Sequence, residues 1–503
     1  MKLKLGVALV CFTAIAYGVN EEFKHSLYPN MVHLYNKVPE SVDSLSDMFS
    51  QGLFYGRLRF NSFGFKWKDE LQISSGKSVK KDHLIAAVGG SVIYKSGYLN
   101  GFSFSTGLYG TFAQGSLDRD EAYLYKAGKG SFSRYDRLID GTDGVISLAQ
   151  AYLAYRYEKT EVKVGRQIFE SFLTRSNDTK MIPNTFEGVS LVTKEVPKTV
   201  LKVAYLTRQK LRDHSEFHSV LAYGKVPSTA VTEYTGFTQN DDSSVHLGLT
   251  KTKLNTAGID DNLVVFDFKN NTVEDLTLFA NYTAVPELFS SAMFEFNYKF
   301  DVADWSIIPG LRYMYQFDNG AGSIGSASRY GHSTIKGVST LSGYNDPESL
   351  DSWLVAARLD LVHDNLKFRL GYTKIADKAD IIAPWRGFPT TGYTRAMAQY
   401  NWYANTESYM LQVDYHPETF YNIFILGRFV YQDFDDKKPV VQADSKVFTL
   451  DVMEGFGSTS SVYMKVRYAH VWGKDDTPIV GVPDVFKLDK SYDELRLEVN
   501  YLF

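Results

Sequence analysis

The feature that most limits the fold of this chain is an alternation of apolar and polar residues with a period of two. An alternation of this kind places every second side chain on one face of a β-strand. Most of the runs are about 9 to 13 residues long, which is the reach of a tilted strand across a bilayer. The runs lie near 102–112, 292–300, 305–317, 353–361, 366–372, 421–431 and 495–503.

The connections between these runs alternate between tight turns and long polar loops. Eight turns and nine loops separate eighteen strands, and an even number places both ends of the barrel sheet on the periplasmic side. Residues 217–224 are an alternative extra strand. The tight turns lie near 96–100, 158–160, 194–199, 269–272, 301–304, 364–365, 417–420 and 455–459, and the loops near 66–82, 114–145, 168–185, 208–261, 284–290, 318–351, 376–407, 433–445 and 472–491.

The sequence therefore predicts an all-β fold, a transmembrane antiparallel up-and-down β-barrel of about 18 strands with short periplasmic turns and long extracellular loops. The 34 Tyr and 34 Phe residues often stand at strand ends, where interfacial aromatic girdles would use them. A soluble β-sandwich or β-helix would show the same alternation against a protein core. The segregation of loops to one end and turns to the other favours the closed barrel.

The N-terminus has the pattern of a secretory signal. Lys2 and Lys4 precede an apolar run at 5–16 and then the small-x-small sequence Ala16-Tyr17-Gly18, which predicts a signal peptide over 1–18. The run is too short for a membrane-spanning helix. Lipoprotein acylation of Cys11 is the alternative, but Val10 is larger than such sites usually accept.

The remaining chain is predicted to form an N-terminal segment and the barrel. Residues 19–51 include a stretch, 43–49, that is expected to form a short periplasmic or lumenal helix. Residues 52–503 form the transmembrane β-barrel. The formal charge of minus 4 and the absence of a basic tail argue against a nucleic-acid partner.

On the strands, basic residues are prominent at the positions that alternate with the apolar ones. If the apolar positions face lipid, these basic positions face the lumen. A row of fixed cations in a narrow pore attracts carboxylates or phosphates. The alternative is that these cations pair with lumenal acids and brace the wall; the acids are Glu161, Glu295, Asp360, Asp414, Glu494 and Glu498. The predicted pore-lining ladder is Arg57, Arg59, Arg156, Lys163, Lys202, Arg312, Arg358, Lys367, Arg369, Arg428, Lys465, Arg467 and Arg496.

Two neighbouring segments carry a resemblance to a known family. The sequences VKVGRQ at 162–167 and SNDTKMIPNTFEGVSL at 176–191 resemble the OprD-type porins, with weaker similarity at 54–61 and 385–403. The chain most resembles the versions found in Campylobacter-like and Helicobacter-like bacteria. The resemblance implies an eighteen-stranded barrel, a constriction made by inward-folded loops, and an arginine ladder that guides carboxylate-bearing solutes such as amino acids, small peptides or organic acids.

The third loop, 168–185, is the predicted constriction. Arg175, Asp178 and Lys180 are placed at its narrowest point, where opposed charges would orient dipolar solutes. The alternative is that Asn177, Asp178 and Pro183 only build turns in a packed loop.

Other chemical signals are weak. Gly320, Gly322 and Gly325 fit a dinucleotide-binding glycine pattern, but a Ser/Gly loop without a helix is expected there. His214 and His218 have the spacing of helical metal ligands without an evident third ligand. No catalytic residues, cofactor or metal are therefore predicted, although the acidic pairs at 241–242, 260–261 and 475–476 are compatible with Ca²⁺ or lipopolysaccharide cations.

The sequence predicts a porin of the Gram-negative outer membrane, which gives passive diffusion of small hydrophilic solutes and is not an enzyme. The alternatives are an adhesin or structural barrel, and less readily a barrel hydrolase. The expected partners are outer-membrane lipid and lipopolysaccharide, the solutes, the barrel-assembly machinery through the strand that ends at Phe503, and two further copies in a homotrimer.

Overall fold

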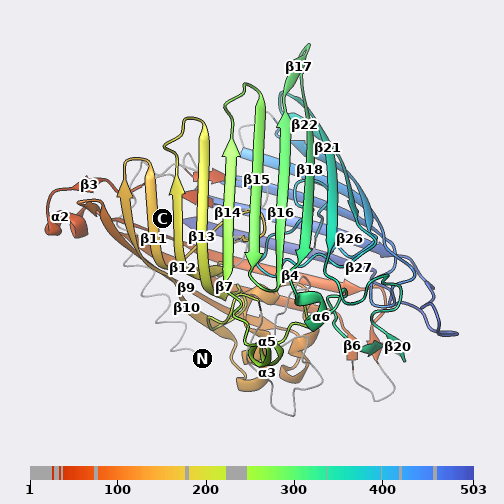
Figure 1. The fold of residues 1–503 in the computed structure, drawn as a ribbon. Helices are drawn as coiled ribbons and strands as arrows, with labels where there is room; N and C mark the ends of the chain where they lie inside the picture. Colours follow the sequence, from red (N-terminus) through yellow and green to blue (C-terminus); the bar gives the residue numbers. More distant parts are fainter. Residues whose placement is uncertain are drawn as a thin grey trace.

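The protein is described by a computed structural model that covers residues 25–27, 33–35, 38–72, 78–175, 181–221, 246–335, 337–397, 399–417, 422–456 and 461–503. Eighteen long antiparallel strands within these ranges close into one barrel (Figure 1). The predicted signal peptide, 1–18, lies outside the described residues. None of the helices in the described ranges is both long and apolar enough to cross a membrane.

The barrel closes where the last strand pairs with the first, from Tyr492 opposite Trp67 to Leu502 opposite Arg57. The predicted all-β barrel and its eighteen strands are thus confirmed. The strands are β4 (Leu53–Trp67), β7 (His83–Lys95), β9 (Phe102–Gly115), β10 (Gly144–Tyr157), β11 (Thr160–Gln167), β12 (Thr185–Thr193), β13 (Thr199–Lys210), β14 (Leu263–Asn270), β15 (Leu276–Val285), β16 (Phe289–Tyr298), β18 (Trp305–Asp318), β21 (Ser352–His363), β22 (Leu366–Ile375), β23 (Glu407–Tyr415), β24 (Asn422–Asp433), β25 (Ser445–Phe456), β26 (Val462–Gly473) and β27 (Tyr492–Leu502).

The connections follow the expected alternation with one correction. The connection expected at 284–290 as a long loop is a tight hairpin of residues 286–288, because Val285 and Phe289 already pair across β15 and β16. The alternative strand at 217–224 is not seen over 217–221, where His218 makes one isolated bridge to Gln209. Residues 222–224 lie outside the described residues.

Short elements gather at the two ends of the barrel (Figure 1). At the tight-turn end lie β3 (Ser41–Val42), α2 (Leu45–Ser50), β8 (Tyr98–Leu99) and β17 (Phe300–Val302). The loop end carries β5 (Leu71–Gln72), β6 (Ser78–Lys80), η1 (Arg119–Leu124), η2 (Lys129–Ser131), α3 (Arg134–Asp140), α5 (Lys251–Ala257), α6 (Ala321–Gly325), β19 (Thr334–Ile335) and β20 (Val338–Ser339), and the pair β1 (His25–Leu27) and β2 (His33–Tyr35) forms a separate ribbon. At the glycine pattern the five-residue α6 covers Gly322 and Gly325, and the segment that follows, 326–333, is a loop without a helix, as expected.

The two faces of the strands differ as the alternation predicts. In β9, Phe102, Leu108 and Phe112 are at least half exposed on the outer face, whereas Ser103 and Ser105 are buried on the inner face. In β10 a bulge between Leu148 and Gln150 shifts the phase by one residue. As a result Gln150, Tyr152, Ala154 and Arg156 share the inner face with Ser147 on the other side of the bulge.

The largest apolar core lies inside the barrel rather than around it. Loop residues such as Trp385 and Tyr393 are fully buried against inward positions of the strands, including Phe289 and Leu354. The rings of Phe289 and Trp385 stack with centroids 6.0 Å apart. The long loops therefore fold into the lumen and pack there, which narrows the path through the barrel.

Candidate functional site

The strand register decides which of the predicted ladder residues face the lumen. All thirteen occupy the inward phase of their strands, as the pairing of Arg358 and Asp360 in β21 with Gly371 and Arg369 in β22 illustrates. Arg57 and Arg59 are almost completely buried on the inner face of β4. Many of the acids that the sequence analysis gives as possible ion-pair partners of the ladder cations lie on the same inner face.

Four wall arginines are held by carboxylates on the same or a neighbouring strand. Arg369 makes two hydrogen bonds of 2.6 Å to Asp360, and Arg467 Nη2 lies 2.5 Å from Asp451 Oδ2. Bidentate pairs of this kind fix the guanidinium plane and neutralise its charge. In the same way Arg312 Nε lies 2.8 Å from Glu295 and Arg496 Nη2 2.6 Å from Glu494.

The other ladder residues also have partners, which are either neutral hydrogen-bond acceptors or carboxylates at longer distances. Arg358 donates to Asn297 Oδ1 at 2.6 Å, and Lys202 donates to the carbonyl of Glu170 at 2.8 Å. The remaining contacts are Lys163 and Arg156 with Glu161 at 2.9 and 3.5 Å, Lys367 with Asp414 and Asp360 at 3.4 and 3.7 Å, Arg59 with Glu498 at 3.6 Å, and Lys465 with Asp451 at 3.8 Å.

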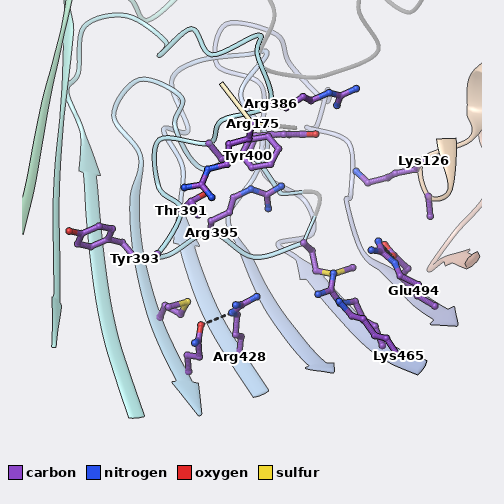
Figure 2. Close-up of a pocket in the computed structure, with 18 of the residues that line it drawn as sticks. Lys126, Arg175, Arg386, Thr391, Tyr393, Arg395, Tyr400, Arg428, Lys465 and Glu494 are labelled. Atoms are coloured by element: carbon purple, nitrogen blue, oxygen red, sulfur yellow. Dashed lines mark hydrogen bonds and ion pairs between the residues drawn. The ribbon is translucent and has the colours of Figure 1, made fainter. Parts of the chain in front are cut away.

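A cavity of about 290 Å³ lies inside the lumen, between the strands at the C-terminal end of the sequence and the inward-folded loops (Figure 2). Eleven basic residues line it and only two acidic ones, Glu170 and Glu494. The basic lining residues are Lys126, Lys129, Arg175, Arg212, Arg369, Arg386, Arg395, Arg428, Lys465, Arg467 and Arg496. Arg369, Arg467 and Arg496 are paired with carboxylates, but the basic residues still outnumber these acids, so the lining carries an excess of positive charge.

Arg395 and Arg428 differ from the wall arginines because neither makes an ion pair within the described part of the chain. Arg428 donates to the neutral amide oxygen of Gln412 at 2.6 Å. Arg395 donates to the carbonyl of Ala396 at 2.6 Å, and its guanidinium carbon lies 4.6 Å from the centre of the Phe388 ring and 5.4 Å from that of Tyr400. Burial lowers the pKa of Arg395 to about 10, so it remains charged at neutral pH.

Lys126 approaches the cavity from the second loop, opposite Arg395 (Figure 2). Its ammonium group lies 5.2 Å from the centre of the Tyr492 ring and 5.6 Å from that of Trp67. Burial, with the nearby charges of Lys490 and Lys129, lowers the pKa of Lys126 to about 7.

The seventh loop, residues 376–406, supplies more of the cavity lining than any other loop, and the wall arginines hold it in place. Arg312 donates to the carbonyl of Pro389 at 2.7 Å, and Arg369 donates to that of Gly392 at 2.9 Å. Each of these arginines uses one edge for a carboxylate on the wall and another for the loop backbone. The paired arginines thus position the loop that presents Arg395.

Only part of the predicted constriction loop, 168–185, lies within the described residues. Arg175 lines the cavity and its backbone N–H donates to the carbonyl of Trp385 at 2.9 Å. Asp178 and Lys180 lie outside the described residues. Sequence reasoning did not single out Arg395, Arg386 or Lys126. For the two arginines, the signal available was the density of aromatic and basic residues at 385–403, which the family resemblance also includes.

The alternative sites take structural roles where they are described. His214 Nδ1 and His218 Nε2 are 2.8 Å apart and share a hydrogen bond. Among the acidic pairs, Asp261 accepts from the backbone of Leu221 and pairs with Lys251 at 3.1 Å, and residues 241–242 fall outside the described ranges. The residues that the structure describes include no group of three potential metal ligands.

Solved structures share this architecture. OccAB3 of Acinetobacter baumannii superposes with a TM-score of 0.64 at 15% identity, covering 90% of this chain and 99% of that one. OccK5 (OpdH) of Pseudomonas aeruginosa gives 0.59 at 14% identity, with 90% and 98% covered. OpdK of Pseudomonas aeruginosa, solved with vanillate, gives 0.57 at 15% identity with the same coverage.

The sequence comparison identifies the family directly. No significant match exists among curated protein sequences. The family model described as outer membrane porin, OprD family, matches residues 94–419, which is about two thirds of the chain. The closed barrel and its location in the outer membrane agree with this match. The chain belongs to the OprD family of outer membrane porins.

Proposed function

We propose that this porin guides small carboxylate-bearing solutes, such as amino acids, small peptides or organic acids, by passive diffusion through its basic lumen. The observation that carries the proposal is the cavity lining, in which eleven basic residues face two acidic ones. Fixed cations in a narrow path lower the barrier for anions and raise it for cations.

Arg395 and Arg428 are the residues proposed to meet the solute carboxylate at the cavity. A carboxylate about 4 Å from a guanidinium gains about 1 kcal/mol in bulk water and about 4 kcal/mol at an effective dielectric constant near 20. An attraction in this range draws the solute in and still permits release. The ladder residues on either side, including Arg57, Arg59 and Arg156, are proposed to extend the positive path.

The proposed constriction combines the third and seventh loops. Arg175, Asp178 and Lys180 of the third loop remain assigned to its narrowest part, now with Arg386 and Arg395 of the seventh. The presence of vanillate in the OpdK structure supports an aromatic carboxylate as one solute to test. We also propose, from the sequence resemblance, that the chain belongs to the branch found in Campylobacter-like and Helicobacter-like bacteria. Trimer formation and recognition of the strand that ends at Phe503 by the assembly machinery are further proposals.

The test is single-channel recording from purified protein in a planar bilayer, with the reversal potential measured across a KCl gradient. The native channel is expected to prefer Cl⁻ and to show block by added carboxylate solutes. The double variant Arg395→Gln with Arg428→Gln is expected to lower the anion preference by at least about fivefold.

The matched control is Arg119→Gln, which removes a guanidinium whose contacts lie in the second loop with the carbonyls of Leu138 and Ile139. It is expected to leave the reversal potential unchanged. A native channel that prefers cations, or a double variant with unaltered selectivity and unaltered carboxylate block, would contradict the proposal.

A further inference from the structure

An apolar face is exposed at the tight-turn rim of the barrel. Leu45 and Phe49 of α2 are 62% and 55% exposed. They are four residues apart and therefore lie on the same side of the helix. Phe54 at the start of β4 is also about half exposed on the outer face, and it pairs across the strands with Tyr94, which bonds to Phe49. These side chains form an apolar patch that other described parts of the protein leave uncovered.

The segment that carries this patch is firmly attached to the barrel. The hydroxyl of Ser44 accepts from the N–H of Asp47 at 3.1 Å and begins the helix. The N–H of Tyr98 donates to Glu40, and that of Gly97 donates to Met48, both at 2.8 Å. In addition β3 pairs in parallel with β8. The position of α2 relative to the rim is therefore fixed by backbone bonds.

The attachment places α2 on the outer side of the rim rather than in the lumen. Tyr94 of β7 and Phe104 of β9 belong to the outward phase of their strands. The Tyr94 hydroxyl donates to the carbonyl of Phe49 at 2.7 Å, and the rings of Phe49 and Phe104 have centroids 5.6 Å apart. Figure 1 shows α2 and β3 at the end of the barrel that carries the tight turns.

The patch continues an aromatic belt on the outer face. Phe102 packs on Tyr155 with centroids 4.7 Å apart, and Tyr94 packs on Phe104 at 5.7 Å. Aromatic residues at the rim of a transmembrane barrel lie at the boundary between headgroups and acyl chains. Because Phe49 contacts Phe104, the helix extends this belt beyond the strand ends.

We propose that α2 is an interfacial anchor, which lies on the periplasmic leaflet of the outer membrane with Leu45 and Phe49 inserted among the phospholipids. The partner is the acyl and glycerol region of a phospholipid layer. Residues 38–50 contain Glu40, Asp43 and Asp47 and no basic residue, so the contact is apolar and does not select anionic headgroups. The proposal is independent of the solute that passes through the lumen.

The natural sequence makes a labelling experiment straightforward, because Cys11 is its single cysteine and lies in the predicted signal peptide. In a Cys11→Ser background, Leu45→Cys would be labelled with a fluorophore and the protein placed in phosphatidylcholine vesicles that contain a lipid with a nitroxide high on its acyl chain. Leu108→Cys on the outer face of β9 is the lipid-exposed reference. Asp43→Cys, two residues before Leu45, is the water-exposed reference.

The Leu45 probe is expected to be quenched by the lipid nitroxide to a degree similar to the Leu108 probe and at least about threefold more than the Asp43 probe. Aqueous iodide is expected to show the reverse order. If the Leu45 probe were quenched to the same degree as the Asp43 probe by both the lipid nitroxide and iodide, α2 would lie in the periplasm and the proposal would be overturned. Retention of the heat-sensitive band shift on gels shows that each labelled barrel is folded.

A second copy of the chain is the rival occupant of the patch. Nanodiscs that hold one barrel each distinguish the two cases, because lipid remains available there and a second copy does not. Undiminished lipid quenching of the Leu45 probe in these nanodiscs supports the anchor. Loss of that quenching, together with disulfide-linked dimers of Leu45→Cys at higher protein density, would assign the patch to a contact between copies instead.

Discussion

The arginines that face the lumen, from the strands or from the inward-folded loops, include two groups that differ in their partners. On the wall, Arg467, Arg369 and Arg312 each hold a carboxylate. At the cavity, Arg428 holds a neutral amide, and Arg395 holds a carbonyl and aromatic rings. The first group has its charge neutralised and orders the loops. The second group makes no ion pair within the described residues and is the one proposed to meet a passing solute.

This difference shows that an inward position alone does not decide what a lumenal cation does. The sequence places Arg428 of β24 and Arg467 of β26 at inward positions of their strands. Only the neighbour across the strand separates them, which is Gln412 for Arg428 and Asp451 for Arg467. Bracing of the wall is therefore assigned to Arg467, and attraction of the solute is proposed for Arg428.

The largest expected effect is on stability, when a wall pair is broken. The Asp451 carboxylate is fully buried between Arg467 and Lys465. Asp451→Asn removes the negative charge and leaves two buried cations without it, which is expected to cost about 3–5 kcal/mol of unfolding free energy. The measurement is urea unfolding of the refolded barrel in lipid vesicles. A loss below about 1 kcal/mol would mean that the wall pairs do not brace the barrel.

A change in ion selectivity is expected when Arg428 is given a carboxylate partner like those of the wall arginines. Gln412→Glu places a carboxylate at the position where Gln412 Oε1 now accepts from Arg428. The new pair is expected to lower the anion preference about threefold to fivefold, since it neutralises one cation of the cavity lining. Asp414, which also contacts Gln412, remains close to Lys367.

The control for this variant is Gln412→Met, which removes the hydrogen bond without adding charge. It is expected to leave the reversal potential close to the native value. Equal changes in both variants would show that the hydrogen bond to Arg428, rather than its free charge, sets the selectivity. Single-channel recording in a KCl gradient measures both.

The division between the two groups also marks what the sequence can reveal. Strand phase predicts that Arg428 and Arg467 lie on the inner face, because a period of two is a local property of the sequence. The same holds for Arg156, because the bulge in β10 precedes the part of the strand from which its phase is derived. The position of Arg395 depends on contacts distant in sequence, such as Arg312 with Pro389, 77 residues away. No periodicity in a loop encodes such contacts. The short hairpin at 286–288 was missed because Pro286 and Glu287 have the composition of a longer loop.

A pH effect is expected at the fourth loop, which supports the seventh. His218 Nδ1 donates to the carbonyl of Ser219, so its Nε2 accepts from His214 Nδ1 at 2.8 Å. Burial lowers the pKa of His214 to about 4, with Asp213 opposing and Arg386, Lys210 and Arg134 adding to the shift. The packed loop therefore binds fewer protons than the open loop, and its packing is stable above about pH 6.5 and weakens as the pH falls toward 4.

The measurement is hydrogen exchange of residues 211–221 at several pH values, after correction for the intrinsic rate. Protection is expected to fall as the pH goes from 7 to 4.5. His214→Gln removes the titrating group, so its protection should vary less over the same range. A native loop whose protection is constant between pH 7 and 4.5 would show that His214 does not control the packing of the pair Arg386 and Asp213, which lie 2.9 Å apart.

The smallest effect is expected for an ion pair that has the short distance of the wall pairs without their burial. Lys68 Nζ lies 2.7 Å from Asp475 Oδ2 in the loops, where both side chains are about half exposed. Asp475→Asn is expected to cost far less unfolding free energy than Asp451→Asn, because water solvates both ions when they separate and Asp489 remains 3.4 Å from Lys68. The same urea titration compares it with Asp451→Asn. If the two variants lost equal stability, distance alone would determine the strength of these pairs; a large difference would assign it to burial, the property that separates the braced wall from the open ends of the barrel.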